Sequence, residues 1–171
     1  MQIKQELRER HTLAVIVDNE PGILARIAGL FTARGYNIES LTVTDISEDD
    51  LISRITIVTS ASAHVMEQII AQLDRLVPVH KVVDLTALGP HVERELALVK
   101  VAGTGDHRIE ALRLAEVYRA RVVDATIGSF VFEVTGSAEK IDKFVELMRE
   151  VGLVEVARTG SVAIARGREA V

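Results

Sequence analysis

The chain has 171 residues, of which 48% are hydrophobic, and a formal net charge of −5. This length accommodates one ordinary domain or two small ones, with enough apolar residues for a buried core. The absence of cysteine excludes disulfides, thiolate metal sites and a cysteine nucleophile. Lys and Arg are scattered along the sequence, which argues against a broad nucleic-acid-binding surface.

The apolar runs of the sequence are short. A membrane-spanning helix requires about 20 consecutive apolar residues, and the longest runs, such as LAVIV, fall far below that length. The N-terminal sequence MQIKQELRERH lacks the apolar centre of a signal peptide. We therefore expect a globular cytoplasmic protein with no membrane segment.

The first half of the chain has the hydrophobic periods of an α+β domain. Residues 11–18 alternate as a strand that is apolar on both faces, which is typical of a central strand. A helix follows, with the apolar stripe Ile23, Ile27, Leu30 and Phe31, and it ends at Gly35. Two strands over 36–46 and 51–60 come next, joined by the acidic turn SEDD. The last two predicted elements are a helix that carries Met66 to Leu76 and a strand over 79–88. The predicted order is therefore β-α-β-β-α-β.

The second half repeats this order. The predicted elements are a strand over 95–103, a helix over 108–118, strands over 121–128 and 130–136, a helix from Ala138 and a strand over 153–159. The second helices of the two halves match best, because Ser62-Ala63 corresponds to Ser137-Ala138 and the apolar positions after each pair recur in step. The sequence thus predicts an α+β fold of two ferredoxin-like βαββαβ domains in tandem.

The expected boundaries follow from these elements. They give an N-terminal extension over 1–10, a first domain over 11–87, a linker over 88–93 and a second domain over 94–171.

A search for catalytic or metal-binding residues finds no convincing constellation. The five histidines show no pair at metal-ligand spacing, and the segment HVERE, with His91, Glu93 and Glu95, is better interpreted as a solvated turn than as a metal motif. The segment GTGDHR resembles a dinucleotide loop only briefly, because Arg108 occupies the third glycine position; a helix capped by Thr104 or Asp106 explains it. We therefore favour a binding or regulatory protein without catalytic residues or a bound metal.

The stretch DNEPGILARIAGLF, from Asp18 to Phe31, has two interpretations. Asp18 or Asn19 can cap the helix, and Pro21 suits its first turn because its missing N–H is not needed there. Capping does not explain Gly22, since glycine within a helix costs about 1 kcal/mol relative to alanine. A helix N-terminus with bare backbone can instead receive a carboxylate. The segment is either only a cap and turn or a ligand-binding loop.

These residues, with RGYNIESLTV, resemble the ACT domain, a βαββαβ module that binds amino acids between paired copies. Together with ISRITI, HVERELALVKV and VEVARTGSVAIARG, they are similar to the small, regulatory subunit of acetohydroxyacid synthase (acetolactate synthase), over His11 to Gly167. The resemblance implies that the first domain is an ACT domain. It also implies a non-catalytic subunit that activates a separate large subunit and confers feedback inhibition by valine in branched-chain amino acid biosynthesis.

The resemblance further implies a homodimer that forms through ACT domains, and thiamine diphosphate, Mg²⁺ and FAD on the catalytic large subunit, with no cofactor on this chain. By position, the expected valine-binding residues are Asn19, Pro21, Gly22, Ile23 and Leu24 in one chain. Asn37 and Ile38 of a second chain would complete the site. Backbone N–H groups near Gly22 and Ile23 would receive the carboxylate, Asn37 the ammonium group, and side chains such as Ile23 and Ile38 the isopropyl group.

Two other classes of protein remain as alternatives. A free-standing amino-acid sensor that controls transcription would require a helix-turn-helix or a basic ribbon, and the sequence shows neither. An enzyme with a catalytic C-terminal half would require a residue set that the sequence does not supply.

Overall fold

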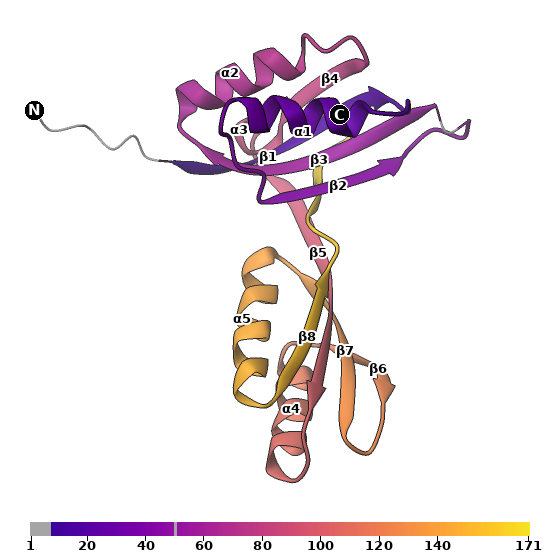
Figure 1. Cartoon of the computed structure of the whole chain (residues 1–171), viewed down its shortest axis with the longest axis vertical. Coiled ribbons are helices and arrows are strands. Elements are labelled where there is room, and N and C mark those ends of the chain that lie inside the picture. The colour runs from indigo at the N-terminus through magenta and orange to yellow at the C-terminus, as the bar shows by residue number, and fades with distance from the viewer. Residues whose placement is uncertain (1–7, 50) are drawn as a thin grey trace, which may run out of the picture. The chain divides into compact units, whose positions relative to one another are not determined.

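A computed structural model describes residues 8–49 and 51–171, which form two compact units. The first unit contains the described residues up to Val92 together with Val162–Val171, and the second contains Glu93–Ser161 (Figure 1). No helix in the described parts of the chain is both long enough and apolar enough to span a membrane.

The first unit is a four-stranded antiparallel sheet in the order β2-β3-β1-β4. Its elements are β1 (Glu9–Asp18), α1 (Ile23–Ala33), β2 (Ser40–Asp45), β3 (Ile52–Ala61), α2 (Ala63–Leu73), β4 (Val79–Asp84) and α3 (Leu85–Leu88). The first strand is central, as its two apolar faces predict, and β2 and β4 are the edge strands.

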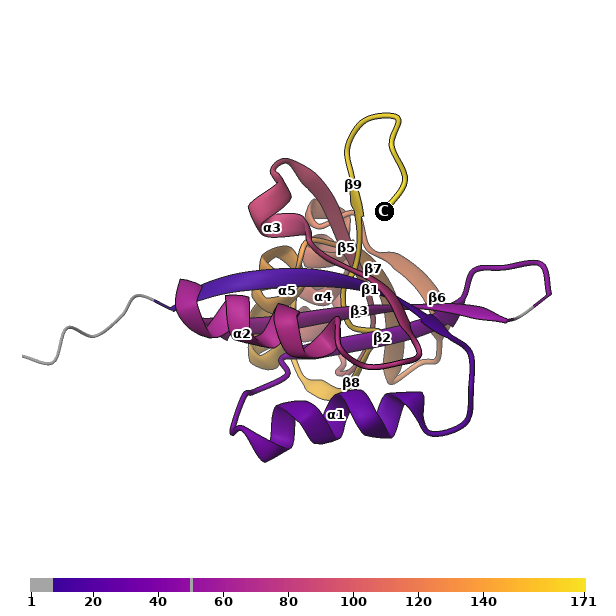
Figure 2. The same cartoon turned by 90° about the horizontal axis from the view of Figure 1, so that it is seen from above.

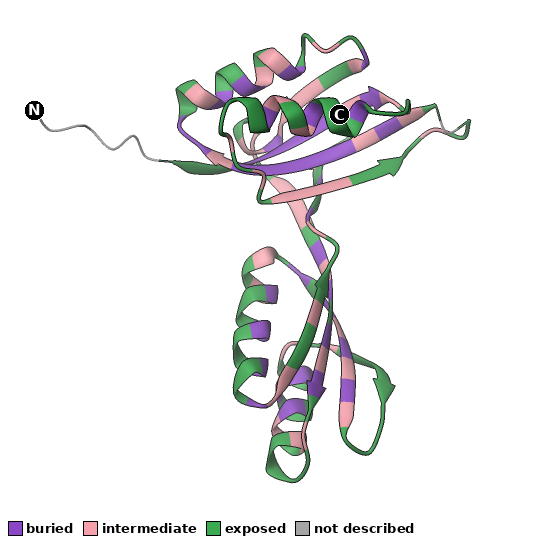
Figure 3. Cartoon of the chain, in the orientation of Figure 1, coloured by how far each residue is buried: buried purple, intermediate pink, exposed green. Residues whose placement is uncertain are grey.

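Both long helices of the first unit pack against the same face of its sheet. Alternate residues of β1 and β3 point to this face and meet the apolar stripes of α1 and α2. The buried residues of this core are Leu13, Val15, Val17, Ile23, Ile27, Phe31, Ile55, Ile57, Ala61, Met66, Ile69 and Leu73. Figure 3 shows the buried stripes along the inner sides of both helices.

The opposite face of β1 is covered by segments that the sequence analysis did not place there. Ala14 packs with Leu85 of α3 and with Ala163 of β9 (Val162–Ala165). The strand β9 pairs with β5 (His91–Ala102), and the Arg166 N–H donates to the Pro90 carbonyl oxygen at 3.4 Å. The last ten residues, expected in the second domain, therefore pack with the first unit.

The second unit repeats the topology with the strand order β6-β7-β5-β8. Its elements after β5 are α4 (Asp106–Val117), β6 (Arg121–Ala125), β7 (Ser129–Gly136), α5 (Ala138–Glu150) and β8 (Leu153–Arg158). The core joins the inner faces of β5 and β7 to α4 and α5, with Phe132 and Phe144 fully buried at its centre. Each unit thus has the predicted ferredoxin-like order, and the α+β fold class is confirmed.

Three local expectations were wrong. The expected strand over 79–88 ends at Asp84, because the Asp84 carboxylate accepts the N–H groups of Thr86 and Ala87 and starts the short helix α3. The expected linker is largely structured, since α3 reaches Leu88 and β5 begins at His91. The strand β9 follows the last strand that the sequence analysis predicted.

Candidate functional site

The loop from Asp18 to Gly22 is fixed by backbone hydrogen bonds to the ends of two other segments. The Asp18 N–H donates to the Pro78 carbonyl oxygen at 2.8 Å, and the Asn19 N–H donates to the Leu51 carbonyl oxygen at 2.7 Å. The loop leading into α1 is therefore tied both to the residue before β4 and to the residue before β3.

Gly22 is the N-cap residue of α1, and the helix begins at Ile23. The expectation that Asp18 or Asn19 caps this helix was therefore wrong, as was the placement of Gly22 inside the first turn. Gly22 has a φ of 90°, a left-handed conformation that glycine adopts at little cost. The Asp18 carboxylate instead contacts the His80 ring, with Oδ1 at 2.6 Å from Nε2.

The first turn of α1 presents backbone N–H groups to solvent. The Ile23 N–H donates to the Glu20 carbonyl oxygen at 3.3 Å, and the Arg26 N–H to the Gly22 carbonyl oxygen at 3.0 Å. In the part of the chain that the structure describes, the N–H groups of Leu24 and Ala25 have no acceptor. Unpaired N–H groups at the positive end of a helix dipole favour an anionic ligand.

The expected valine-binding residues of this loop differ in how exposed their side chains are. Asn19, Pro21, Gly22 and Leu24 are exposed, whereas Ile23 is only 5% exposed and packs in the core of the first unit. The Ile23 side chain therefore does not face solvent and is not available to cover a ligand. Leu24, which is 42% exposed, is the apolar side chain that this loop presents.

Asn37 and Ile38 lie beyond the other end of α1. The Thr59 hydroxyl donates to the Asn37 carbonyl oxygen at 2.6 Å, and Ile38 packs at the edge of the core. Because α1 has 11 residues, its length of about 16 Å separates Asn37 from Gly22. Figure 2 shows α1 along its length, with the loop from β1 at one end and the turn toward β2 at the other. One chain alone does not bring the two groups together.

The Arg26 and Asp18 side chains beside the loop already have polar partners. Arg26 Nη1 lies 3.1 Å from Glu20 Oε1, and His80 contacts Asp18 as described above. Among the described residues, no group of three or more His, Cys, Asp or Glu side chains could hold a metal ion. A surface pocket of about 330 Å³ in the first unit, lined partly by Lys81, Leu88 and Arg166, includes none of the expected effector residues.

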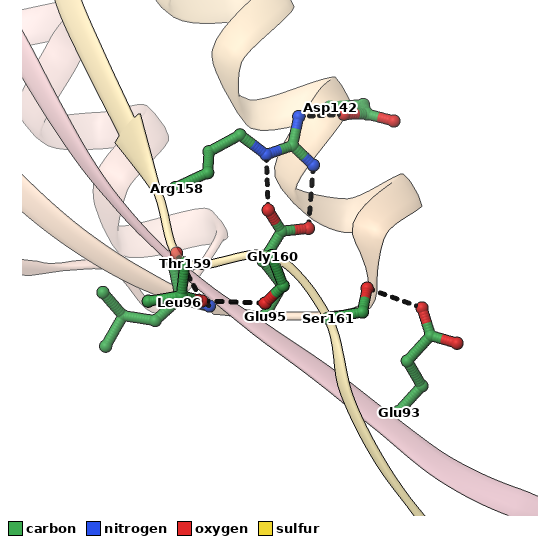
Figure 4. A network of polar contacts seen from close by, with 8 residues as sticks. All are labelled: Glu93, Glu95, Leu96, Asp142, Arg158, Thr159, Gly160 and Ser161. Atoms are coloured by element: carbon green, nitrogen blue, oxygen red, sulfur yellow. Dashed lines mark hydrogen bonds and ion pairs between the residues drawn. The ribbon is translucent and has the colours of Figure 1, made fainter. Parts of the chain in front are cut away.

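The segment HVERE contributes to a partly buried polar network (Figure 4). Glu95 is 5% exposed, and its two carboxylate oxygens accept Arg158 Nε at 2.6 Å and Nη2 at 2.9 Å. Arg158 Nη1 donates to Asp142 of α5 at 2.6 Å. The hydrogen bonds that Arg158 donates to Glu95 are the main reason that the pKa of Arg158 is raised.

The interpretation of HVERE as a solvated turn was wrong, because the whole segment lies in β5 and Glu95 is buried. Glu95 shares the inner face of β5 with Ala97 and Val99, and Ala97 pairs with Arg158 of β8. An acidic residue in phase with buried positions was the available signal, because a carboxylate on such a face requires a cation. The Ser161 hydroxyl also donates to Glu93 Oε1 at 2.8 Å.

Two family descriptions match most of the chain between them. Residues 13–81 match the AHAS small subunit-like ACT domain, and residues 94–167 match the small subunit of acetolactate synthase.

Individual relatives extend along nearly the whole chain. A probable acetolactate synthase small subunit from Archaeoglobus fulgidus is 49% identical over 160 residues, which cover 94% of this chain and 99% of the relative. The acetolactate synthase isozyme 3 small subunit from Escherichia coli is 44% identical over 159 residues, with 92% and 96% covered. The crystal structure of an acetolactate synthase small subunit from Thermotoga maritima aligns with a TM-score of 0.85 at 36% identity, covering 94% of this chain and 99% of that one.

Proposed function

Because this chain belongs to the family of acetolactate synthase small subunits, whose members are regulatory subunits, we propose that it activates the catalytic large subunit and confers feedback inhibition by valine. Catalysis resides on the large subunit. Thiamine diphosphate, Mg²⁺ and FAD would bind there, and the small subunit would change how well that site works. For valine to inhibit, it must bind one conformation of the complex more tightly than another.

The observation that carries the proposal is the exposed N-terminus of α1. The N–H groups of Leu24 and Ala25 lack acceptors within the described residues, and Gly22 leaves open space beside them. The carboxylate of valine would accept these N–H groups and gain from the helix dipole. The proposed donors therefore lie two residues further into the helix than Gly22 and Ile23, which the resemblance suggested.

The rest of the ligand would be bound by side chains of two chains. Leu24 replaces the buried Ile23 as the side chain that covers the isopropyl group, together with Ile38 of a second copy. Asn37 of the second copy and backbone carbonyl groups would bind the ammonium group. The separation of Gly22 and Asn37 along α1 supports a site that two chains share.

The edge strand β2 supports a particular dimer. This strand is an edge strand of the first unit's sheet, and an edge strand can pair with a strand of another chain. Two copies joined at β2 would form one eight-stranded sheet around a two-fold axis. Light scattering at micromolar concentration should then give the mass of a dimer, and a monomer under these conditions would rule out this arrangement.

Titration calorimetry of the chain alone tests the effector assignment. We expect valine to bind, with leucine and isoleucine binding more weakly by about 1–3 kcal/mol for each methylene that does not fit. Lysine and aspartate serve as controls, and we expect neither to bind because the pocket would have to bury a charged side chain where valine has an isopropyl group. Leucine binding a thousandfold tighter than valine would contradict the choice of effector.

A further inference from the structure

The hairpin that joins β2 to β3 is the most acidic stretch of the chain. From Gly35 to Ser53 the sequence contains five acidic residues and no Lys, Arg or His. The acidic residues are Glu39, Asp45, Glu48, Asp49 and Asp50, of which Asp50 lies outside the described residues. Glu39 and Asp45 already have partners, because Glu39 accepts the Ser60 hydroxyl and Asp45 accepts the Ser53 hydroxyl.

Two large apolar side chains flank the carboxylates at the end of this hairpin. Ile46 is 52% exposed and Leu51 is 61% exposed, and Figure 3 shows the end of the hairpin mostly in the colour of exposed residues. We call Ile46, Glu48, Asp49 and Leu51 the tip surface. Apolar side chains ringed by charge are typical of an interface with another protein.

The described part of this tip is held by its own hydrogen bonds. The Ile46 N–H donates to the Ile52 carbonyl oxygen at 2.9 Å, and the Ile52 N–H donates to Ser47 Oγ at 3.0 Å. The Ser47 hydroxyl and the Leu51 N–H lower the pKa of Asp49, so this carboxylate stays charged. The tip surface therefore presents fixed negative charge beside two apolar side chains.

The tip is also bonded to the loop before α1, because the Leu51 carbonyl oxygen accepts the Asn19 N–H at 2.7 Å. A ligand that moves this loop would move the backbone of the tip surface through that bond. Occupancy of the loop and contact at the tip can thus affect one another.

We propose that the tip surface docks on the large subunit, against a surface that is apolar at its centre and basic at its rim. This inference extends the proposed function, since it names the surface through which the effector loop would reach the catalytic partner. A second copy of this chain does not fit, because it would present the same carboxylates and like charges would repel. Membership of a small-subunit family implies a large subunit as partner, and a basic rim on its docking surface would have the complementary charge.

Association of the purified large subunit with the full chain tests this surface. We would measure the dissociation constant by interferometry for wild type, Ile46→Ser/Leu51→Ser and Glu48→Gln/Asp49→Asn. We expect the apolar double variant to associate at least about tenfold more weakly, as truncation of central interface residues does. The amide double variant should associate more weakly at low salt and lose part of the salt dependence.

Control variants carry the same kinds of chemical change, apolar to serine and carboxylate to amide, in the second unit. Ile127→Ser alters an isoleucine that is 92% exposed between β6 and β7, and Glu116→Gln/Glu146→Gln removes two exposed carboxylates from α4 and α5. We expect both controls to associate like wild type. Wild-type association by the tip variants, or equal weakening by the controls, would overturn the proposal.

Calorimetry with valine on the same variants separates this inference from the proposed effector role. Tip variants that bind valine normally but associate weakly support the docking surface. Weak association of the tip variants in a chain that never binds valine would also support the docking surface, while removing the effector assignment.

Discussion

Gly22 is glycine for two physical reasons that act together. Its φ of 90° lies in the left-handed region that other residues adopt only with strain, and a Cβ at this position would meet no atom within 4 Å. A side chain there would therefore strain the backbone and fill the space that the proposed ligand carboxylate would occupy. Gly105 has the same two properties at the start of α4, with a φ of 58°.

Gly22 and Gly105 together permit a controlled test of the proposed valine site. We expect Gly22→Asp and Gly105→Asp each to lower the free energy of unfolding by about 1–2 kcal/mol, because both residues have positive φ. Only Gly22→Asp should abolish valine binding, since it adds a negative charge beside the N–H groups of Leu24 and Ala25. Calorimetry and urea denaturation measure the two effects. Equal loss of valine binding in both variants would mean that the loop is only structural.

The ion pair between Arg158 and Glu95 gives a second prediction at this scale. Arg158→Met would leave the Glu95 carboxylate buried without its cation and should destabilise the chain by about 2–4 kcal/mol. Glu95→Leu/Arg158→Met should recover most of this loss, because it replaces the pair with apolar side chains. Urea denaturation of both variants measures these differences. A single variant as stable as wild type would show that Glu95 reaches water or another cation.

Among the elements, α2 and α5 begin with the same residue type but differ in their capping. The Ser137 hydroxyl accepts the Lys140 N–H at 3.3 Å, whereas the Ser62 hydroxyl oxygen is buried and makes no hydrogen bond within the described residues. Both helices begin with the same Ser-Ala pair, so the sequence offered no reason to expect this difference. It depends on the orientation of one hydroxyl in each helix.

The two serines therefore predict opposite results for one substitution. Ser137→Ala should destabilise the chain by about 1 kcal/mol, because it removes a helix cap. Ser62→Ala should leave stability unchanged or increase it, because it removes a buried hydroxyl that lacks a partner. Thermal unfolding of the two variants measures the difference. A larger loss from Ser62→Ala would contradict the capping assignment.

The long elements were predictable because each has a clear hydrophobic period. The alternation from Leu13 to Val17 and the stripe from Ile23 to Phe31 both appear as buried residues in the structure. The helix α3 was missed because it is four residues long and depends on the Asp84 side chain. The start of α1 was misplaced because Gly22 supplies the N-cap by its backbone conformation, which sequence alone does not show.

For the whole molecule, the order of the elements predicted both units. It did not predict the unit against which the last ten residues pack. Residues after Ser161 return to the first unit, where Ala163 packs with Ala14 and Leu85. The sequence signal for this packing was weak, because only Ala163 of the four residues in β9 is buried. Long-range packing of this kind depends on tertiary contacts that hydrophobic periodicity does not encode.

The candidate site was predictable only in part for the same reason. Sequence resemblance pointed to the loop before α1; this loop is exposed, and the nearby N–H groups of Leu24 and Ala25 have no acceptor among the described residues. The sequence did not show that the Ile23 side chain is buried, because an apolar residue in the first turn can face either way. It also did not show that Leu51 holds the loop through a backbone bond.

The most direct test is an assay of acetolactate formation by the cognate large subunit, with and without this chain, across a titration of valine. We predict that the chain raises the rate and that valine reverses this increase, with the Gly105→Asp variant behaving like wild type. Activation that persists at saturating valine would contradict the effector assignment. A folded chain that neither activates the large subunit nor confers sensitivity to valine would contradict the regulatory function proposed for it.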